Sequence, residues 1–302
     1  MIVIIGKSGQ LAQALAKQLQ AAGNENFVCL GRDDIDITSF DALSEKLSSY
    51  LANGADTVNK CEVNVIINAS AYTAVDKAEE EITQSTLINA TAVKNLALVA
   101  KEMNAYFLHI STDYVFSGKQ NTPYLPASEY APINQYGKSK MAGELAISES
   151  YAENSAILRT SWVYSEFGTN FVKSMLRLMN ERDALNIVYD QIGSPTNADT
   201  LASVSLDFVG NKVTGIHHVC DLGVTSWFDF AKAIYQFGKE LGLLSKDVRI
   251  MPILSSAYPT PAKRPHYSVL DTTSTQQSLS NFELPYWQDS LYKTLSLLKQ
   301  DS

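Results

Sequence analysis

The chain has 302 residues, of which 45% are hydrophobic and 19% are charged, and its formal net charge at pH 7 is −8. This balance is typical of a globular protein with a substantial core and excludes a disordered chain. The acidic composition argues against nucleic acid as a main partner, because phosphate backbones bind basic surfaces. The first apolar run lacks a basic leader and is too short to span a bilayer, so we expect a cytoplasmic protein with no membrane partner.

Strands and helices are predicted to alternate from the first residue. Residues 1–5 are a continuous, mostly β-branched apolar run, which predicts a strand buried on both faces. Leucines and alanines at helical spacing follow it, and the same alternation continues down the chain. Further strands are predicted at 27–30, 63–68, 106–110 and 156–159, and further helices at 40–51, 84–103 and from 136. The order predicts an α/β fold, a Rossmann-type doubly wound parallel sheet covered by helices on both faces.

The alternation loosens after residue 165. Four prolines between 252 and 265 indicate extended or turning backbone. Helices are predicted at 170–179 and 225–238, and short strands at 185–189 and 215–219. We therefore expect two domains. Residues 1–165 are expected to form a Rossmann-type domain, to which the two short strands are candidates to return, and residues 166–302 a smaller α/β domain.

A glycine-bearing turn joins the first strand to the first helix. Residues 6–12 read Gly-Lys-Ser-Gly-Gln-Leu-Ala, a Gly-x-x-Gly-x-x-Ala spacing. Glycines at such a turn let the backbone approach a pyrophosphate, and the helix N-terminus offers it free amide groups. The turn predicts a dinucleotide site, so we expect residues 1–165 to be the NAD(P)-binding Rossmann domain and residues 166–302 the substrate-binding domain. An ordinary strand-to-helix turn is the alternative.

Tyr136 and Lys140 are four residues apart on a predicted helix. Residues at this spacing lie on one helix face, so we expect the Lys140 ammonium to lie near the Tyr136 phenol and to favour its ionised form. A phenol with an ordinary pKa near ~10 would then exchange protons at neutral pH. The spacing is weak by itself, because it also arises by chance.

Polar or small residues follow all five predicted strands of the first domain. The carboxyl ends of parallel strands meet at one edge of a sheet, where ligands bind, so we expect these segments to line one crevice. The segments are residues 6–10, 31–32, 68–72, 111–114 and 160–162.

Assembled, these motifs resemble the extended short-chain dehydrogenase/reductases, and within them the dTDP-4-dehydrorhamnose reductases. The resemblance runs almost end to end. Besides the glycine turn, it is carried by Ile-Asn-Ala-Ser-Ala-Tyr-Thr-Ala-Val-Asp-Lys-Ala-Glu from Ile67, Ser-Thr-Asp-Tyr-Val-Phe from Ser111, Arg-Thr-Ser-Trp-Val-Tyr from Arg159, Asp-Gln-Ile-Gly-Ser-Pro-Thr from Asp190 and Ala-Tyr-Pro-Thr-Pro-Ala-Lys-Arg-Pro from Ala257. It implies reduction of the carbon-4 ketone of a nucleotide-sugar substrate, dTDP-4-dehydro-L-rhamnose, to dTDP-L-rhamnose.

The resemblance also implies a role for each matching residue. Tyr136 supplies a proton, Lys140 lowers the pKa of Tyr136 and holds the nicotinamide ribose, and Thr112 hydrogen-bonds the carbonyl oxygen. The cofactor-binding residues are Gly6, Ser8, Gly9, Gln10, Leu11, Arg32, Asp36, Ile37, Ala69, Ser70, Ala71, Tyr72, Tyr136 and Lys140. The substrate-binding residues are Thr112, Asp113, Tyr114, Trp162, Asn170, Phe171 and Arg264.

Several of these assignments have alternatives. Arg32 follows the second strand, where an arginine accommodates the extra phosphate of NADP, so NADPH is expected to be preferred and NADH still used. The alternative for Arg32 is a solvated surface arginine; for Trp162 it is a core position, and for Arg264 a surface salt bridge. Some family members dimerise through magnesium held by glutamates, and this chain has Gln13 and Ala14 at one such position. No metal is therefore expected, and the oligomeric state, with a homodimer as the partner to consider, is open.

Two other functions on this scaffold stay open. A nucleotide-sugar epimerase or dehydratase is one, although dehydratases commonly have Asp-Glu after the threonine, where this chain has Asp113 and Tyr114. The other is a non-catalytic regulatory subunit resembling the β subunit of methionine adenosyltransferase. The intact Thr112, Tyr136 and Lys140 favour an enzyme.

Overall fold

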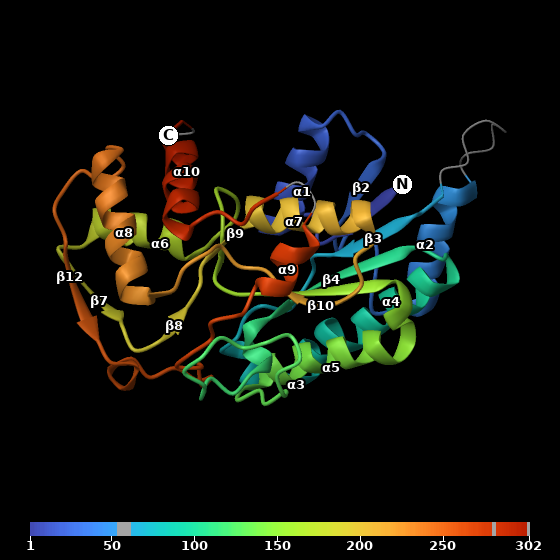
Figure 1. Cartoon of the computed structure of the whole chain (residues 1–302), viewed down its shortest axis with the longest axis horizontal. Coiled ribbons are helices and arrows are strands. Elements are labelled where there is room, and N and C mark those ends of the chain that lie inside the picture. Colours follow the sequence, from blue (N-terminus) through green and yellow to red (C-terminus); the bar gives the residue numbers. More distant parts are fainter. Residues whose placement is uncertain (53–61, 280–281, 301–302) are drawn as a thin grey trace.

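A six-stranded parallel sheet is the centre of the computed structural model, which describes residues 1–52, 62–279 and 282–300 (Figure 1). The strand order is β10-β5-β4-β3-β1-β2, so the chain starts inside the sheet, runs to one edge and then crosses to build the other side. The direction reverses between β1 and β3, and ligands bind at such a switch point in open α/β sheets. The strands are β1 (Ile2–Ile5), β2 (Phe27–Leu30), β3 (Val65–Asn68), β4 (Tyr106–Thr112), β5 (Ser155–Thr160) and β10 (Gly215–His218).

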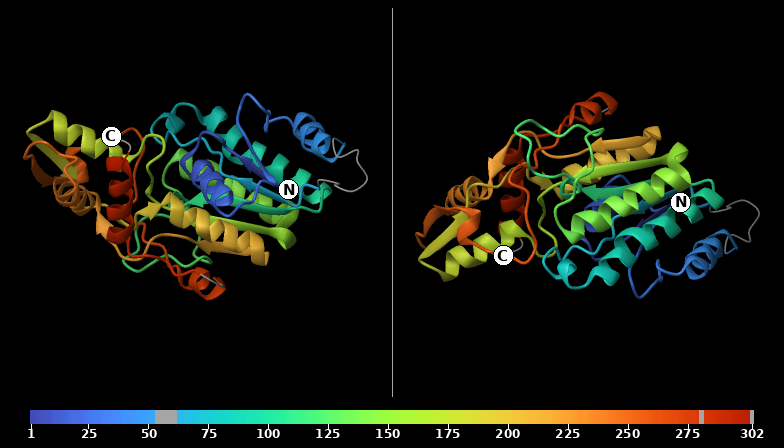
Figure 2. Two further views of the ribbon diagram at one scale, coloured as in Figure 1. Left: turned by 90° about the horizontal axis from the view of Figure 1, so that it is seen from above. Right: turned by 90° about the horizontal axis from the view of Figure 1, so that it is seen from below.

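Helices cover both faces of this sheet, as Figure 2 shows from above and below. Successive side chains of a strand point to opposite faces, so β1 contributes to a hydrophobic core on each face of the sheet. Ile4 packs under α1 and α7, whereas Val3 and Ile5 pack under α2 and α4. This explains why the strands read as continuous apolar runs. The covering helices are α1 (Gln10–Ala21), α2 (Phe40–Ala52), α4 (Ala92–Glu102), α5 (Gln135–Tyr151) and α7 (Ala198–Asn211).

The helix predicted at 84–103 is not uniform. It consists of α3 (Ile82–Thr86), a π-helical stretch η2 (Leu87–Thr91) and α4. The wider turn carries Asn89, whose side chain bonds the backbone N–H and carbonyl of Tyr72 and the Ser139 hydroxyl. π-helical stretches occur mostly as local insertions at functional sites, and this one fixes the loop that follows β3.

The smaller lobe has its own apolar core, built from α6 (Phe171–Glu181), α8 (Trp227–Glu240) and α10 (Trp287–Gln300). In Figure 1 it lies at the left, beyond the ends of the sheet strands. Its strands pair as β7 (Ala184–Val188) with β12 (Arg249–Ile253), β6 (Val163–Tyr164) with β9 (Thr196–Asn197), and β8 (Ile192–Gly193) with β11 (Thr225–Ser226). The short helices are η1 (Lys77–Glu79), η3 (Asp113–Val115), η4 (Ala152–Asn154), η5 (Ser255–Ala257) and α9 (Thr273–Ser278).

The two short strands that were candidates to return to the parallel sheet take different positions. The strand near 185–189 does not return to the parallel sheet, because Leu185 packs into the smaller lobe's core and β7 pairs with β12. The strand near 215–219 does join that sheet, as β10 beside β5. The unpredicted helix α7 also lies on the sheet, so residues 198–218 pack with the first lobe.

None of the helices in the described ranges combines the length and the apolar character needed to cross a membrane.

Candidate active site

The glycine turn after β1 touches the loop after β3 at the switch point of the sheet. Gly6 has φ +108, and a Cβ placed on it would lie 2.9 Å from the carbonyl carbon of Ala69 and the nitrogen of Ser70. Only glycine fits this backbone conformation and this contact. Gly9 precedes α1, and no side chain of the described residues caps that helix N-terminus. The first amide groups of α1 are thus available to an anion, as a dinucleotide pyrophosphate requires.

Gln10 and Asn170 tie this turn to the smaller lobe. The Gln10 Oε1 accepts hydrogen bonds from the Ser165 hydroxyl at 2.8 Å and from the Asn170 Nδ2 at 2.9 Å. Asn170 also begins α6, because its Oδ1 accepts from the Lys173 amide. These two predicted site residues therefore hold the lobes together, and Leu11 is a core residue under the turn.

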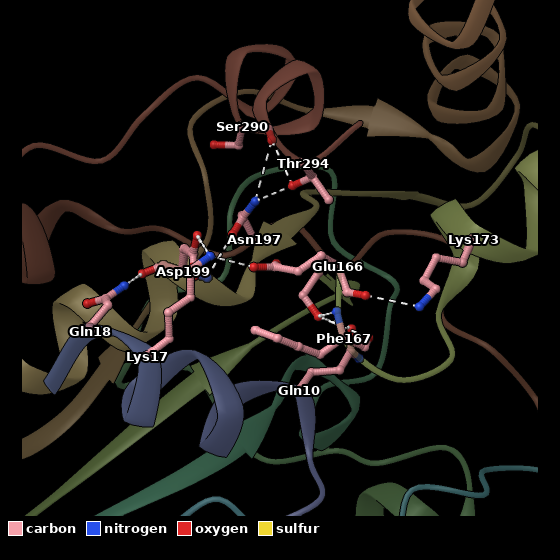
Figure 3. Close-up of polar contacts among 11 residues, drawn as sticks. Gln10, Lys17, Gln18, Glu166, Phe167, Lys173, Asn197, Asp199, Ser290 and Thr294 are labelled. Carbon is pink, nitrogen blue, oxygen red and sulfur yellow. Dashed lines mark hydrogen bonds and ion pairs between the residues drawn. The ribbon is translucent and has the colours of Figure 1, made fainter. Parts of the chain in front are cut away.

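Lys17 adds a contact between the lobes beside Gln10 (Figure 3). Its amine, on α1, lies 2.6 Å from the Glu166 carboxylate. Within the smaller lobe, Lys173 on α6 donates to the Glu166 carbonyl, and Asn197 donates to the Thr294 hydroxyl of α10 at 2.6 Å. The glycine turn and the smaller lobe are thus joined through Gln10 and Lys17.

At the end of β2, Arg32 is exposed and Asp34 accepts a hydrogen bond from the Gly31 amide at 2.8 Å. That amide lowers the pKa of Asp34. Asp36 accepts from the Thr38 amide and hydroxyl, and Ile37 packs partly into the core. Of the predicted cofactor residues in this segment, Arg32 is therefore the one whose side chain is free to reach into solvent.

The loop after β3 is held by side chains, which leaves its backbone to line the crevice. Ser70 donates from its amide and its hydroxyl to the Asn68 Oδ1, and Tyr72 donates from its hydroxyl to Glu81. Ala69 and Ala71 in the same loop are partly buried, and the backbone of Ala69 lies against Gly6.

Tyr136 lies at the start of α5, directly beside the end of β4. Asn134 caps this helix by accepting from the Gly137 amide at 2.8 Å. A Cβ on Gly137 would lie 2.2 Å from the Tyr114 carbonyl oxygen, so glycine is required for the helix to approach the 112–114 segment this closely. The rings of Tyr114 and Tyr136 meet edge to face, with centroids 5.5 Å apart.

The electrostatics of Tyr136 differ from the sequence expectation. Burial raises the pKa of Tyr136, and a hydrogen bond with Thr112 opposes the rise. Lys140 is also buried, which lowers the pKa of its amine to about 8 against the opposing charge of Glu144. Its Nζ donates to the Ile110 carbonyl at 2.6 Å, so it does not favour the phenolate here. Tyr136 is therefore protonated at neutral pH, the state that an acid needs before it gives up its proton.

Thr112 and Asp113 complete the candidate active site around Tyr136. The Thr112 hydroxyl donates to the Asp113 Oδ1 at 2.9 Å and accepts from the Tyr114 amide at 3.2 Å. Burial raises the pKa of Asp113 to about 6, against hydrogen bonds from the Ser268 and Thr112 hydroxyls. The buried hydroxyls of Thr112 and Tyr136 thus lie at the end of β4, where each is able to donate a hydrogen bond to the carbonyl oxygen of a substrate.

The remaining candidates lie further into the smaller lobe. Trp162 stacks on Trp227 with centroids 3.6 Å apart, and Phe171 packs against the same tryptophan at 4.6 Å. Arg264 makes a two-point ion pair with Asp76, at 3.0 and 2.8 Å. The salt bridge that the sequence left as an alternative is therefore present, and it connects the loop after β3 to the proline-rich segment.

The whole chain is similar to known reductases. It matches the protein family described as RmlD substrate binding domain over residues 1–300. It is 38% identical to the dTDP-4-dehydrorhamnose reductase of Escherichia coli K12, over 98% of this chain and 97% of that protein. The chain belongs to this family.

Solved structures of dTDP-4-dehydrorhamnose reductases have the same fold. The enzyme from Clostridium acetobutylicum is 35% identical, with a TM-score of 0.88 over 99% of both chains. The enzyme from Bacillus anthracis, solved in complex with NADP, is 32% identical, with a TM-score of 0.87 over 97% of both chains. The predicted fold class, a Rossmann-type doubly wound parallel sheet with a smaller lobe, is confirmed.

Sequence reasoning missed two features of this family member's site. Glu144 and Arg159 form a fully buried ion pair, and the signal for it in the sequence was an arginine inside an apolar strand. The second feature is His109, whose Nε2 lies 3.1 Å from the Lys140 Nζ. In the described ranges, no cluster of three or more His, Cys, Asp or Glu is placed to hold a metal ion.

Proposed function

We propose that this chain reduces the carbon-4 ketone of dTDP-4-dehydro-L-rhamnose to dTDP-L-rhamnose with NADPH. One observation supports this most strongly: the hydroxyls of Thr112 and Tyr136 interact at the carboxyl end of β4, on the same edge of the parallel sheet as the glycine turn. Membership of the reductase family and the NADP bound to the Bacillus anthracis relative support the choice of reaction and cofactor.

The residues around the switch point fit a dinucleotide. Gly6 and Gly9 allow the turn to pack tightly, because a Cβ on either would meet backbone atoms, and the N-terminus of α1 offers its amides to the pyrophosphate. In this proposal the sheet lobe, including β10 and α7, binds the cofactor, and the smaller lobe binds the sugar nucleotide. A hydride for the ketone carbon is the chemistry that NADPH supplies when bound.

Tyr136 and Thr112 act on the carbonyl oxygen. Tyr136 is protonated at neutral pH and gives its proton to the alkoxide that forms. The Thr112 hydroxyl turns from Asp113 to the same oxygen and stabilises its charge. Burial of both groups strengthens these hydrogen bonds, because water does not compete for them.

The proposal is tested by NADPH oxidation on adding the dTDP-4-keto-6-deoxy-L-sugar, prepared beforehand with an epimerase. We expect stoichiometric oxidation of NADPH and formation of the alcohol. Conversion of a nucleotide sugar without net NADPH oxidation would instead favour an epimerase or dehydratase. A stoichiometric synthetase partner in a pull-down, without ketone reduction, would favour the regulatory-subunit alternative.

Arg32 is proposed to select NADPH over NADH by pairing with the extra phosphate. Arg32→Ala is expected to lower the NADPH-to-NADH ratio of kcat/KM by about tenfold or more, since a charged hydrogen bond contributes about 1.5–3 kcal/mol. Arg249→Ala, which removes another exposed arginine on β12, is the matched control and should leave the ratio unchanged. An unchanged ratio in Arg32→Ala would remove this residue from cofactor selection.

We also propose that the protein is cytoplasmic, that it uses NADH as a second cofactor and that it assembles as a homodimer. The family resemblance in the sequence supports them, and light scattering on the purified chain tests the homodimer.

A further inference from the structure

Three buried polar side chains form a line behind the candidate active site. Asn68 on β3 and His109 on β4 are register partners in the parallel sheet. Their side chains meet at 3.0 Å, Asn68 Nδ2 to His109 Nδ1, and the other ring nitrogen, Nε2, lies 3.1 Å from the Lys140 Nζ. All three residues are at most 1% exposed, so each hydrogen bond must be satisfied within the protein.

The orientation of the Asn68 amide follows from Ser70. The backbone amide of Ser70 can only donate, and it lies 3.1 Å from the Asn68 Oδ1. The Ser70 hydroxyl donates to the same oxygen at 2.7 Å. The oxygen of Asn68 therefore faces Ser70, and its NH₂ group faces His109. Because that NH₂ group has only donors, the His109 Nδ1 must accept.

This bond fixes the tautomer of His109. Burial holds the pKa of His109 well below its usual value, with a further contribution from Lys140, so the ring is neutral and carries one hydrogen. With Nδ1 accepting, that hydrogen is on Nε2 and points at Lys140. An ammonium has three donors and no acceptor, whereas a neutral amine has a lone pair that can accept. The amine also donates one hydrogen to the Ile110 carbonyl.

We infer that His109, with its tautomer fixed by Asn68, is a positioning residue that disfavours the ammonium form of Lys140. The inference deepens the proposed function and rests on it only for the catalytic role of Lys140. The Nε2–H of His109 accommodates a neutral amine at Lys140, whereas an ammonium there would meet it donor to donor.

The other groups around Lys140 are few among the described residues. Glu144, one turn further along α5, favours the ammonium, but its carboxylate is shared with Arg159, Ser111 and Tyr130. His109 stacks on Phe107 from its own strand, with centroids 6.4 Å apart. The pKa of Lys140, lowered to about 8, agrees with an amine that changes protonation near neutral pH.

The first test reads the tautomer directly in the wild-type protein, without substrate or cofactor. The chain has four histidines, so ¹⁵N-histidine labelling gives a small spectrum, in which His109→Gln identifies the pair of signals that belongs to His109. We expect a hydrogen on Nε2 and none on Nδ1, with no titration while the protein stays folded. A hydrogen on Nδ1 would overturn the inference, whatever reaction the protein catalyses.

The second test reverses the tautomer. In Asn68→Asp the carboxylate still accepts from Ser70 and now also accepts a hydrogen from His109 Nδ1, which leaves Nε2 as an acceptor for the ammonium. The pKa of Lys140 should rise by about one to two units, read from its ¹³Cε signal and assigned with Lys140→Met. The added charge alone is measured by the same substitution in a His109→Phe background, where the rise should be clearly smaller.

Equal rises in the two backgrounds would mean that the carboxylate acts only through its charge, and they would overturn the positioning role. In the assay with NADPH and the keto sugar, the same shift should appear in the pH profile of kcat/KM for Asn68→Asp. If the wild type shows the Nε2 tautomer but reduces no ketone, the proposed function fails and the inference about Lys140 stands.

Discussion

Tyr136→Phe is expected to lower kcat/KM for ketone reduction by about 10²–10⁴-fold, the usual contribution of a positioned general acid. Only a hydroxyl is lost, and the ring keeps its edge-to-face contact with Tyr114. The thermal unfolding midpoint should therefore change little. NADPH oxidation in the presence of the keto sugar measures the first quantity, and circular dichroism on heating measures the second.

Tyr151→Phe is the matched control for this prediction. Tyr151 is also buried and lies on the same helix, but its hydroxyl accepts from Asn154 at the far end of α5. Its loss should leave kcat/KM unchanged. Turnover near the wild-type value in Tyr136→Phe, or an equal loss in Tyr151→Phe, would show that the phenol of Tyr136 is not the proton donor.

The strands of the sheet could be predicted because each is buried on both faces and reads as a continuous apolar run, as residues 2–5 do. The strand with which a short strand pairs could not be predicted. The position of β7, for example, depends on the packing of Leu185 among helices distant in sequence. The π-helical stretch at 87–91 could not be predicted either, because the hydrogen bonds that Asn89 makes there are with Tyr72, 17 residues away in sequence.

The position of the site could be predicted, but the contacts of its side chains could not. The carboxyl ends of parallel strands lie at one edge of the sheet, so Gly6 after β1 and Thr112 at the end of β4 could be predicted to lie at the same edge. Tyr136 is on α5, beside the end of β4. Helical spacing gives only the face on which Lys140 lies, whereas the direction of its amine depends on His109 and Ile110. The Arg264 to Asp76 pair joins residues 188 positions apart, and no local pattern indicates it.

Loss of either partner of the Glu144–Arg159 ion pair should be strongly destabilising. Both side chains are fully buried, and the guanidinium reaches the two carboxylate oxygens at 3.0 and 2.7 Å. Removing one partner leaves a buried charge without compensation, which costs about 3–5 kcal/mol. Arg159→Met and Glu144→Gln should each lower the free energy of unfolding in urea by about this amount. Ser111, next to Thr112, donates to Glu144, so kcat should also fall.

Arg177→Met provides the control, because it breaks an ion pair of similar geometry on the surface of α6. Arg177 and Glu181 lie 2.9 Å apart and are 62% and 51% exposed, so the expected cost is below about 0.5 kcal/mol. Equal costs for Arg159→Met and Arg177→Met would contradict the prediction. The double variant Glu144→Leu/Arg159→Met should lose less than the sum of the two single losses, because neither charge is then left unpaired in the core. The site would in that case depend on the pair for the placement of Ser111 and Thr112 more than for net stability.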